Sequence, residues 1–135
     1  AVICTNPELS SCRDSEKMIG FIASKSRRAE QGLDPVVQRL LVTRYDPQRA
    51  ARDEALSLDD IGELLGLPLL GVIPESKSVL TSTNLGQPVI TSTADNAGEA
   101  YKDLVKRFLG EQVPLRFVTA EEKGFFSRIM EAARG

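Results

Sequence analysis

The sequence contains no histidine and only two cysteines, Cys4 and Cys12. Without an imidazole the chain cannot form a Ser-His or Cys-His nucleophile, and it lacks the usual histidine ligands of catalytic zinc. Two cysteines at this spacing are also too few for a metal site or a disulfide framework. These absences exclude zinc catalysis and histidine-assisted nucleophilic catalysis by this chain, and we expect no metal site of its own.

Long hydrophobic runs and an excess of positive charge are also missing. No apolar stretch approaches the roughly 20 residues of a transmembrane helix. The N-terminus shows no signal-peptide pattern, so we expect a cytoplasmic protein. A formal net charge of -2 provides no electrostatic footprint for DNA or RNA. We therefore expect no nucleic-acid partner.

The glycine-rich signatures of nucleotide binding are absent from these residues. The sequence has neither a G-x-x-x-x-G-K-[ST] loop nor a G-x-G-x-x-G turn, so no cradle of backbone amides for phosphate can be placed in it. The first residues already read as a strand, with no initiator methionine and no element before them. We therefore expect the back half of something larger.

What the chain does contain is a regular alternation of short apolar runs and helical segments. Strands are predicted over residues 1–4, 39–43 and 69–73, helices over 11–23, 57–65 and from about 93–95 to 109, and a short turn or helix over 75–82. Strict alternation implies parallel strands joined by right-handed crossovers. The sequence thus predicts an α/β fold with a mostly parallel sheet and helices on both faces.

The predicted helices have recognisable ends. Ser10 or Ser11 is the expected N-cap of the first helix, with Asp14 in its first turn. Residues 57–60 form a variant of the capping box, and Gly66 ends that helix. For the last helix we expect Thr93 or Asp95 as N-cap and one apolar face, formed by Tyr101, Leu104, Val105 and Phe108.

Polar residues follow all three predicted strands, at residues 5–8, 43–45 and 73–76. The carboxyl ends of parallel strands meet at one edge of a sheet, and ligands of open α/β sheets bind beyond that edge. Strand-to-helix turns also carry Asn, Pro and Ser for backbone reasons alone. It is the convergence of three such segments that predicts a ligand site here.

The last thirteen residues, 123–135, have an amphipathic pattern. At helical spacing their apolar side chains occupy an arc of about 160°, and the charged ones fill the opposite side. This is typical of a helix lying in the headgroup region of an anionic membrane. The alternative is that the apolar stripe docks on the protein's own core or on a partner subunit. The residues expected to contact the membrane are Lys123, Phe125, Phe126, Arg128, Ile129 and Met130.

Seven segments, in order and nearly without gaps, resemble the carboxyl-terminal half of the MinD family of septum-site-determining ATPases. They are TNPELSSCRDSEKMIG, SKSRRAEQG, LLVTRYDPQRA, SLDDIGELLGLPLLGVIPESKSVL, NLGQPVI, DNAGEAYKDLVKRFLGE and EEKGFFSRIM. The resemblance covers essentially the whole chain. It implies the carboxyl-terminal portion of a P-loop ATPase domain over residues 1–118, followed by a membrane-targeting tail over 119–135.

The resemblance also implies a function. Proteins of this family bind ATP and Mg, form a homodimer with ATP, bind the inner face of the cytoplasmic membrane through a carboxyl-terminal amphipathic helix, recruit MinC and are stimulated by MinE. They regulate where the division septum forms. The family's phosphate-binding loop and switch residues are not among these residues, so we expect this chain alone neither to bind ATP tightly nor to hydrolyse it.

Site residues carry over position by position from the resemblance. It implies that the adenine end of the nucleotide pocket involves Arg44, Pro74, Glu75 and Ser76, and that Glu8 lies near the dimer interface. The implied surface shared by MinC and MinE comprises Ser10, Asp14, Glu16 and Ile19. No catalytic residue is expected in this segment. Two alternatives remain: a non-catalytic α/β module that keeps the partner-binding face, and a fragment of a ParA-like partition ATPase.

Overall fold

Three parallel strands form the centre of the molecule, which we describe from a computed structural model over residues 1–92 and 96–120. The strands are β1 (Val2–Thr5), β2 (Arg39–Tyr45) and β3 (Leu69–Pro74), in the order β1-β2-β3. Both pairings are parallel, with Ile3 opposite Leu40 and Val42 opposite Val72. The predicted α/β class and parallel sheet are confirmed.

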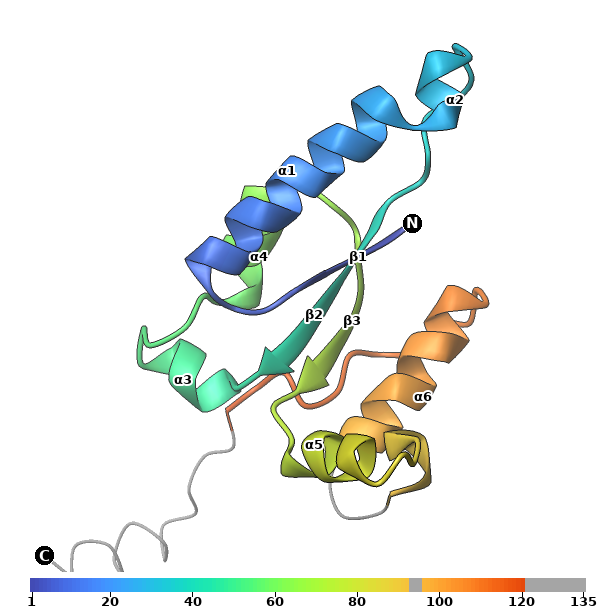
Figure 1. Ribbon diagram of the computed structural model, residues 1–135. Coiled ribbons are helices and arrows are strands. Elements are labelled where there is room, and N and C mark those ends of the chain that lie inside the picture. Colours follow the sequence, from blue (N-terminus) through green and yellow to red (C-terminus); the bar gives the residue numbers. More distant parts are fainter. Residues whose placement is uncertain (93–95, 121–135) are drawn as a thin grey trace, which may run out of the picture.

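Helices cover both faces of this sheet (Figure 1). One face carries α1 and α4, and the other carries α5 and α6. The helical elements are α1 (Leu9–Lys25), α2 (Arg27–Glu30), α3 (Pro47–Ala51), α4 (Leu58–Leu65), α5 (Lys77–Asn84), the short 3-10 turn η1 (Val89–Thr91) and α6 (Ala97–Phe108). Three of them, α2, α3 and η1, were not predicted; at three to five residues they are too short to show helical periodicity.

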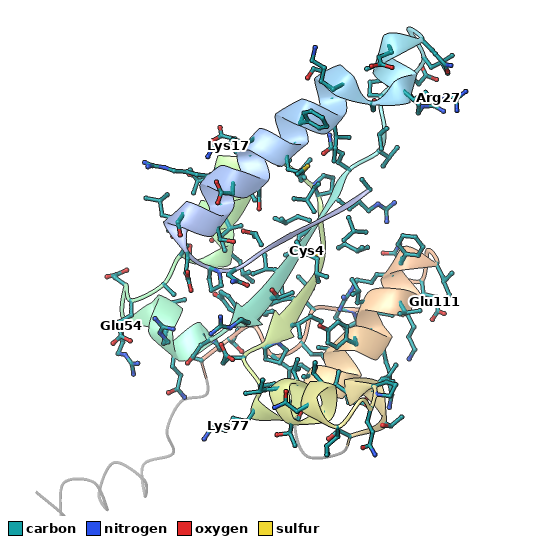
Figure 2. All side chains as sticks on the ribbon, in the orientation of Figure 1. Cys4, Lys17, Arg27, Glu54, Lys77 and Glu111 are labelled. Carbon is teal, nitrogen blue, oxygen red and sulfur yellow. The ribbon has the colours of Figure 1, made fainter. Side chains whose placement is uncertain are left out.

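The side chains of β2 and β3 alternate between two hydrophobic cores. Leu40 and Val42 point to the α1/α4 side, where they pack with Cys12, Ile61 and Leu65. The intervening Leu41, together with Ile73, packs against Ala97 and Ala100 of α6 on the other side. This two-residue period is what a strand buried on both faces requires. Figure 2 shows side chains filling both layers.

The capping predictions hold for α4. The Ser57 hydroxyl accepts a hydrogen bond from the Asp60 backbone N–H at 3.1 Å, and the Asp60 carboxylate accepts one from the Ser57 N–H at 3.0 Å. Gly66 ends the helix in the left-handed conformation, with φ of 61°. These reciprocal bonds satisfy donors that the first helical turn would otherwise leave unpaired.

The prediction for the start of α1 is wrong. The helix begins at Leu9, with Glu8 as its N-cap and no side-chain capping bond. The Ser11 hydroxyl instead accepts the backbone N–H of Asn6 at 3.1 Å. Asp14 therefore lies beyond the first turn, where it pairs with Lys17 at 2.9 Å.

The apolar face predicted for α6 is correct only in part. Tyr101 and Leu104 pack against the second core, but Val105 and Phe108 are half or more exposed. The buried positions are Ala97, Gly98, Ala100 and Asp103. Small residues are needed here because the helix lies close to its neighbours: a Cβ at Gly98 would stand 2.9 Å from the Val89 carbonyl oxygen. Residues 93 and 95, predicted as caps, lie outside the described part of the chain.

Candidate functional site

The three strands end at a common edge, as their polar ends predicted. Thr5 of β1 stands opposite Val42 of β2, and Tyr45 of β2 stands opposite Pro74 of β3. Because all pairings are parallel, the turns that follow the three strands project from the same side of the sheet. The three predicted segments therefore converge in space.

Hydrogen bonds fix the turn after β1 to β2. The Thr43 hydroxyl donates to Asn6 Oδ1 at 2.9 Å and lies 3.3 Å from the carbonyl oxygen of Thr5. On the other side of the turn, Ser11 holds the Asn6 N–H. Asn6 is thus positioned by two elements, β2 and α1. Glu8 follows it, exposed, at the start of α1.

Arg44 interrupts the regular pairing of β2, two residues before the N-cap of α3. Its backbone φ is 57°, and the register of β2 against β3 shifts between Val42 and Tyr45. A left-handed conformation at a residue other than glycine is unfavourable by roughly 1–3 kcal/mol and often occurs at functional sites. The Arg44 side chain reaches across to the turn after β3, where its Nε lies 3.0 Å from Glu75 Oε2. This pair is exposed, so we expect it to orient the two side chains more than to stabilise the fold.

Two short capped helices frame the edge. Asp46 caps α3 by accepting the backbone N–H groups of Gln48 and Arg49 at 2.9 and 3.3 Å, and Pro47 occupies the first helical turn. Ser76 caps α5 by accepting the Val79 N–H at 3.2 Å. The turns after β2 and β3 are joined directly, because the Glu75 N–H donates to the Tyr45 carbonyl at 2.9 Å. The polar side chains of Asp46 and Ser76 are thus held at this edge by hydrogen bonds from the first turns of α3 and α5.

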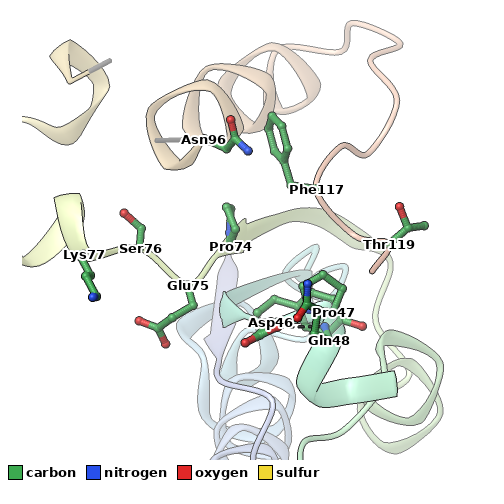
Figure 3. Close-up of a pocket in the computed structure, with 11 residues that line it drawn as sticks. Asp46, Pro47, Gln48, Pro74, Glu75, Ser76, Lys77, Asn96, Phe117 and Thr119 are labelled. Carbon is green, nitrogen blue, oxygen red and sulfur yellow. Dashed lines mark hydrogen bonds between the residues drawn. The ribbon is translucent and has the colours of Figure 1, made fainter. Parts of the chain in front are cut away.

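A cavity of about 480 Å³ lies between these two turns and α6. In Figure 3, Asn96 and Phe117 lie on one side of Pro74, and Asp46, Pro47 and Gln48 lie on the other. Its volume is in the range of small-molecule sites, and it combines apolar walls with a few polar groups. Its lining consists of Tyr45, Asp46, Pro47, Gln48, Pro74, Glu75, Ser76, Lys77, Asn96, Phe117 and Thr119. We call it the edge cavity.

A second cavity, of about 470 Å³, adjoins the same segment on the α5 and α6 side. It includes Thr43, Arg44, Val79, Leu80 and Tyr101. Three of the predicted adenine-end residues, Pro74, Glu75 and Ser76, line both cavities, whereas Arg44 lines only the second. The structure thus brings all four predicted residues to one edge but divides them between two neighbouring hollows.

The edge cavity combines a neutral phenol with charged side chains. Burial raises the pKa of the Tyr45 phenol further above physiological pH, where this group is already neutral. The carboxylates of Asp46 and Glu75 and the ammonium of Lys77 surround the opening with both signs of charge. Within residues 1–92 and 96–120, no group of three His, Cys, Asp or Glu side chains is placed to hold a metal ion.

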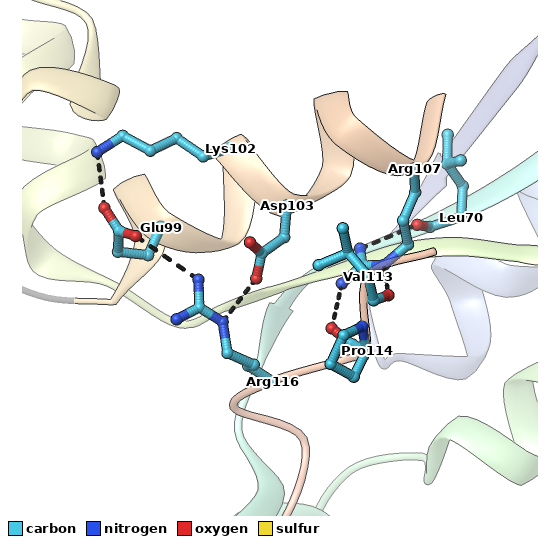
Figure 4. Close-up of polar contacts among 8 residues, drawn as sticks. All are labelled: Leu70, Glu99, Lys102, Asp103, Arg107, Val113, Pro114 and Arg116. Carbon is cyan, nitrogen blue, oxygen red and sulfur yellow. Dashed lines mark hydrogen bonds and ion pairs between the residues drawn. The ribbon is translucent and has the colours of Figure 1, made fainter. Parts of the chain in front are cut away.

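Sequence reasoning missed most of the residues that line the edge cavity. Asp46 and Gln48 were detectable, because Asp-Pro directly after a strand is a helix-start signal. Phe117 and Thr119 were not, because they belong to an irregular segment that returns to the edge only in three dimensions. This segment, residues 111–119, runs back beside α6 after its end (Figure 4). We call it the return strap.

Two arginines fix the return strap to α6. Arg107 donates to the carbonyl oxygens of Val113, Pro114 and Leu70 at 2.7, 2.8 and 3.2 Å. Arg116 Nε donates to Asp103 Oδ2 at 2.7 Å. The Arg116 guanidinium beside Asp103 holds the pKa of that buried carboxyl below its usual value. The strap is thus attached at two points, and Phe117 follows the second.

The predicted partner-binding residues all lie on α1 but do not share one face. Ser10 and Asp14 are exposed and one turn apart, so a single face presents both. At about 100° per residue, Ile19 falls on the side opposite Ser10, and it packs against the first core. Glu16 is exposed on a flank of the helix. Near Ser10 and Asp14, the exposed face continues along α1 to Met18 and Phe21.

The predicted membrane-binding residues, 123–130, lie outside the described residues. Among the residues that are described, no helix has the length and apolar character to cross a bilayer.

Known MinD proteins are similar to this chain. No protein-family model matches it. The chain is 52% identical over 129 residues to the septum site-determining protein MinD of Escherichia coli K12, an alignment that covers 96% of this chain and 48% of that protein. It therefore spans about half the length of such relatives.

Solved structures agree with this similarity. A MinC:MinD cell division protein complex from Aquifex aeolicus matches with a TM-score of 0.75 and 31% identity, over 87% of this chain and 46% of that chain. MinD from Pyrococcus horikoshii OT3, complexed with Mg-ADP, matches with a TM-score of 0.61 over 80% of this chain and 40% of that chain; at 23% identity it supports the fold alone. The resemblance read from the seven sequence segments is confirmed.

Proposed function

We propose that this chain, which corresponds to about half of a septum site-determining MinD protein, works as part of a membrane-associated ATPase that controls where the division septum forms. The observation that carries this proposal is the edge cavity. It is built on the Pro74–Ser76 segment singled out from the sequence, at the edge where α/β folds bind nucleotides. The 52% identity over nearly the whole chain supports the same assignment.

In this proposal the chain supplies the base-binding end of the nucleotide site. Phe117 and Pro74 provide apolar surface for a flat base such as adenine, and Ser76, Gln48 and Asn96 provide polar groups around it. Arg44 and Glu75 stand beside the cavity as a paired charge. Bound Mg would neutralise charge on the phosphates; the residues described here hold and orient the base.

Hydrolysis would require the rest of the ATPase. The transferred phosphoryl group needs a clamp of backbone amides, lysine and metal, and no such loop occurs in this sequence. We therefore expect the isolated 135-residue chain to show no ATP turnover. Turnover that stays with the purified chain through gel filtration would contradict this, and would favour a catalytic arrangement that the sequence does not reveal.

The exposed face of α1 is the proposed surface for MinC and MinE. Ser10 and Asp14 present polar groups on one side, and the neighbouring Met18 and Phe21 add exposed apolar surface. An interface that combines a few charges with an aromatic anchor suits protein recognition. Glu8, exposed where α1 begins at the nucleotide edge, is the proposed dimer contact. The Aquifex aeolicus relative is known in complex with MinC.

Membrane binding is proposed for the tail from Lys123 onward. A single short helix with three basic residues and a few apolar side chains should bind an anionic surface weakly. Two tails held together in a dimer bind far better, because the second contact becomes intramolecular. A nucleotide-dependent homodimer would thereby make residence on the inner face of the cytoplasmic membrane reversible.

Vesicle flotation tests the proposed function. The full-length protein is mixed with vesicles of phosphatidylcholine and phosphatidylglycerol, with Mg and either ATP or ADP. We expect flotation with ATP, little with ADP, and none for the double variant Phe125→Glu, Ile129→Glu. The matched control is the double variant Phe108→Glu, Leu109→Glu, which adds the same two negative charges at exposed apolar residues at the end of α6. Flotation that ignores the nucleotide, or survives the double substitution, would contradict the proposal.

The alternative of a stand-alone binding module rests on the missing phosphate loop. It predicts MinC binding without any nucleotide requirement. The ParA-like alternative predicts salt-dependent retention on DNA. Both can be measured with the same protein preparation, and either result would displace the ATPase assignment.

A further inference from the structure

Phe117 is one of two aromatic residues that line the edge cavity, with Tyr45, yet the return strap that carries Phe117 has no regular secondary structure. Its backbone φ is 62°, in the left-handed region. A bulky aromatic residue adopts this conformation only where its surroundings determine it. The neighbouring residues must therefore hold Phe117 in place.

Both neighbours of Phe117 are anchored. Phe117 itself packs against the second core, whereas Val118 packs against the first core on the opposite face of the sheet. The strap thus crosses the carboxyl edge between the two layers at this point. On the other side of Phe117, Arg116 pairs with Asp103 at 2.7 Å and lies 3.6 Å from Glu99.

The shape of the Arg116 side chain suits it to holding Phe117 in place. Asp103 and Glu99 lie one turn apart on α6, and the forked guanidinium contacts both carboxylates. The same group lies 5.1 Å from the centroid of the Phe117 ring, within cation–π range. Asp103 is buried, so the pair is held in a defined position. Arg116 therefore contacts both α6 and the Phe117 ring in the cavity wall, and Figure 4 shows its contacts with α6.

We propose that Arg116 is a positioning residue for nucleotide binding: paired with Asp103, it holds the return strap so that the Phe117 ring forms the stacking wall for the base. The inference rests on the proposed function, because it needs a base in the edge cavity.

The test separates the base from the phosphates. Isothermal titration of the full-length protein measures the affinity for ADP and, in parallel, for inorganic pyrophosphate, which has no base to stack. For Arg116→Ala we expect ADP affinity to fall about tenfold while pyrophosphate affinity stays unchanged. Arg116→Lys should restore part of the loss, because it keeps the charge but not the fork.

Two further variants keep the result interpretable. Asp103→Asn preserves the shape of the partner and should weaken ADP in the same selective way; it serves if Arg116→Ala fails to fold. Lys102→Ala is the matched control, because Lys102 pairs with Glu99 at 2.6 Å but does not contact the strap. It should leave both affinities unchanged.

The outcomes distinguish the inference from the function beneath it. If wild-type protein binds ADP and the Arg116 and Asp103 variants bind it equally well, the positioning role is wrong and the nucleotide site stands. Equal weakening of ADP and pyrophosphate would also overturn the positioning role, since it would indicate a general structural defect. Wild-type protein that binds neither ligand would overturn the proposed function itself.

Discussion

The hydroxyl of Thr43 donates a 2.9 Å hydrogen bond to Asn6 Oδ1, joining the end of β2 to the turn that follows β1. Both side chains are half-buried at the carboxyl edge of the sheet. The bond connects two of the three polar segments that converge there, and it holds Asn6 at the carboxyl edge of the sheet, two residues before Glu8.

Replacing Thr43 with valine removes that donor and keeps the side chain's shape. We expect the free energy of unfolding to fall by about 1 kcal/mol, the usual net contribution of such a bond. Urea denaturation measures the change. The matched control is Thr81→Val on the exposed surface of α5, where the hydroxyl bonds only the Lys77 carbonyl one turn earlier; it should shift stability by less than about 0.5 kcal/mol. Equal effects at the two positions would contradict a specific role for the Thr43–Asn6 bond.

Acid should weaken the attachment of the return strap. Arg116 lowers the pKa of Asp103 in the folded protein, relative to an ordinary value of 3.8. A carboxyl with a depressed folded pKa contributes stability that is fully present above its unfolded pKa and is lost as pH falls through the folded one. As the pH falls below the pKa that Asp103 has in the unfolded chain, the stability of the wild-type protein should drop. We expect this drop to be steeper than that of the Asp103→Asn variant. Thermal melting of both proteins over a range of pH measures this. If the melting temperatures of the two proteins change with pH in the same way, the Arg116–Asp103 pair does not contribute pH-dependent stability.

Two helical glycines should respond in opposite directions to alanine. At Gly98 an added Cβ would stand 2.9 Å from the Val89 carbonyl oxygen and 3.3 Å from that of Ser92, both backbone atoms. We expect Gly98→Ala to destabilise the protein by about 1–3 kcal/mol. Gly62, within α4, has no neighbouring atom within 4 Å of such a Cβ, so Gly62→Ala should stabilise by up to about 1 kcal/mol. Thermal melts of the two variants would settle the signs, and a stabilising Gly98→Ala would contradict the close approach of α6 and η1.

Two aliphatic residues of α4 should contribute very differently to the stability of the protein, because only one of them is buried in the first core. Ile61 is 0% exposed, whereas Leu64, on the same helix, is 46% exposed. Ile61→Ala should lower the free energy of unfolding by about 2–5 kcal/mol, because a cavity remains among Cys12, Val42 and Leu65. Leu64→Ala should change it far less. A comparable loss at Leu64, measured by urea denaturation, would show that its exposed side faces another part of the protein.

The exposed face of α1 that carries Ser10 and Asp14 is the proposed surface for MinC, so a substitution there should weaken MinC binding. Asp14→Ala should weaken MinC binding by about tenfold, because removing one member of a charge pair across an interface leaves the other charge unpaired. Glu63→Ala, an exposed acid on α4, is the control and should bind MinC normally. Binding can be measured by titrating labelled MinC with the full-length protein and ATP. Normal affinity of the Asp14 variant would remove this residue from the proposed surface.

Much of this protein was determined by local sequence. The apolar runs at β2 and β3, the Ser57–Asp60 capping box and Gly66 each specify their element through interactions within a few residues, so they could be predicted. Parallel pairing followed from strand and helix alternation, and it placed residues 5–8, 43–45 and 73–76 at one edge. The capping of α1 failed because Ser11 bonds the turn before the helix instead of the helix itself.

Tertiary structure alone decided the other half of the site. Asp103 was assigned no role by periodicity, and its burial reflects a partner thirteen positions later in an irregular segment. Phe117 reaches the edge cavity because Arg107 and Arg116 fold the return strap back along α6, a path set by contacts between residues distant in sequence. Helical and strand periods report which side of an element is apolar; they carry no information about where a loop goes. That path depends on ion pairs and carbonyl contacts that exist only once the sheet and α6 have packed.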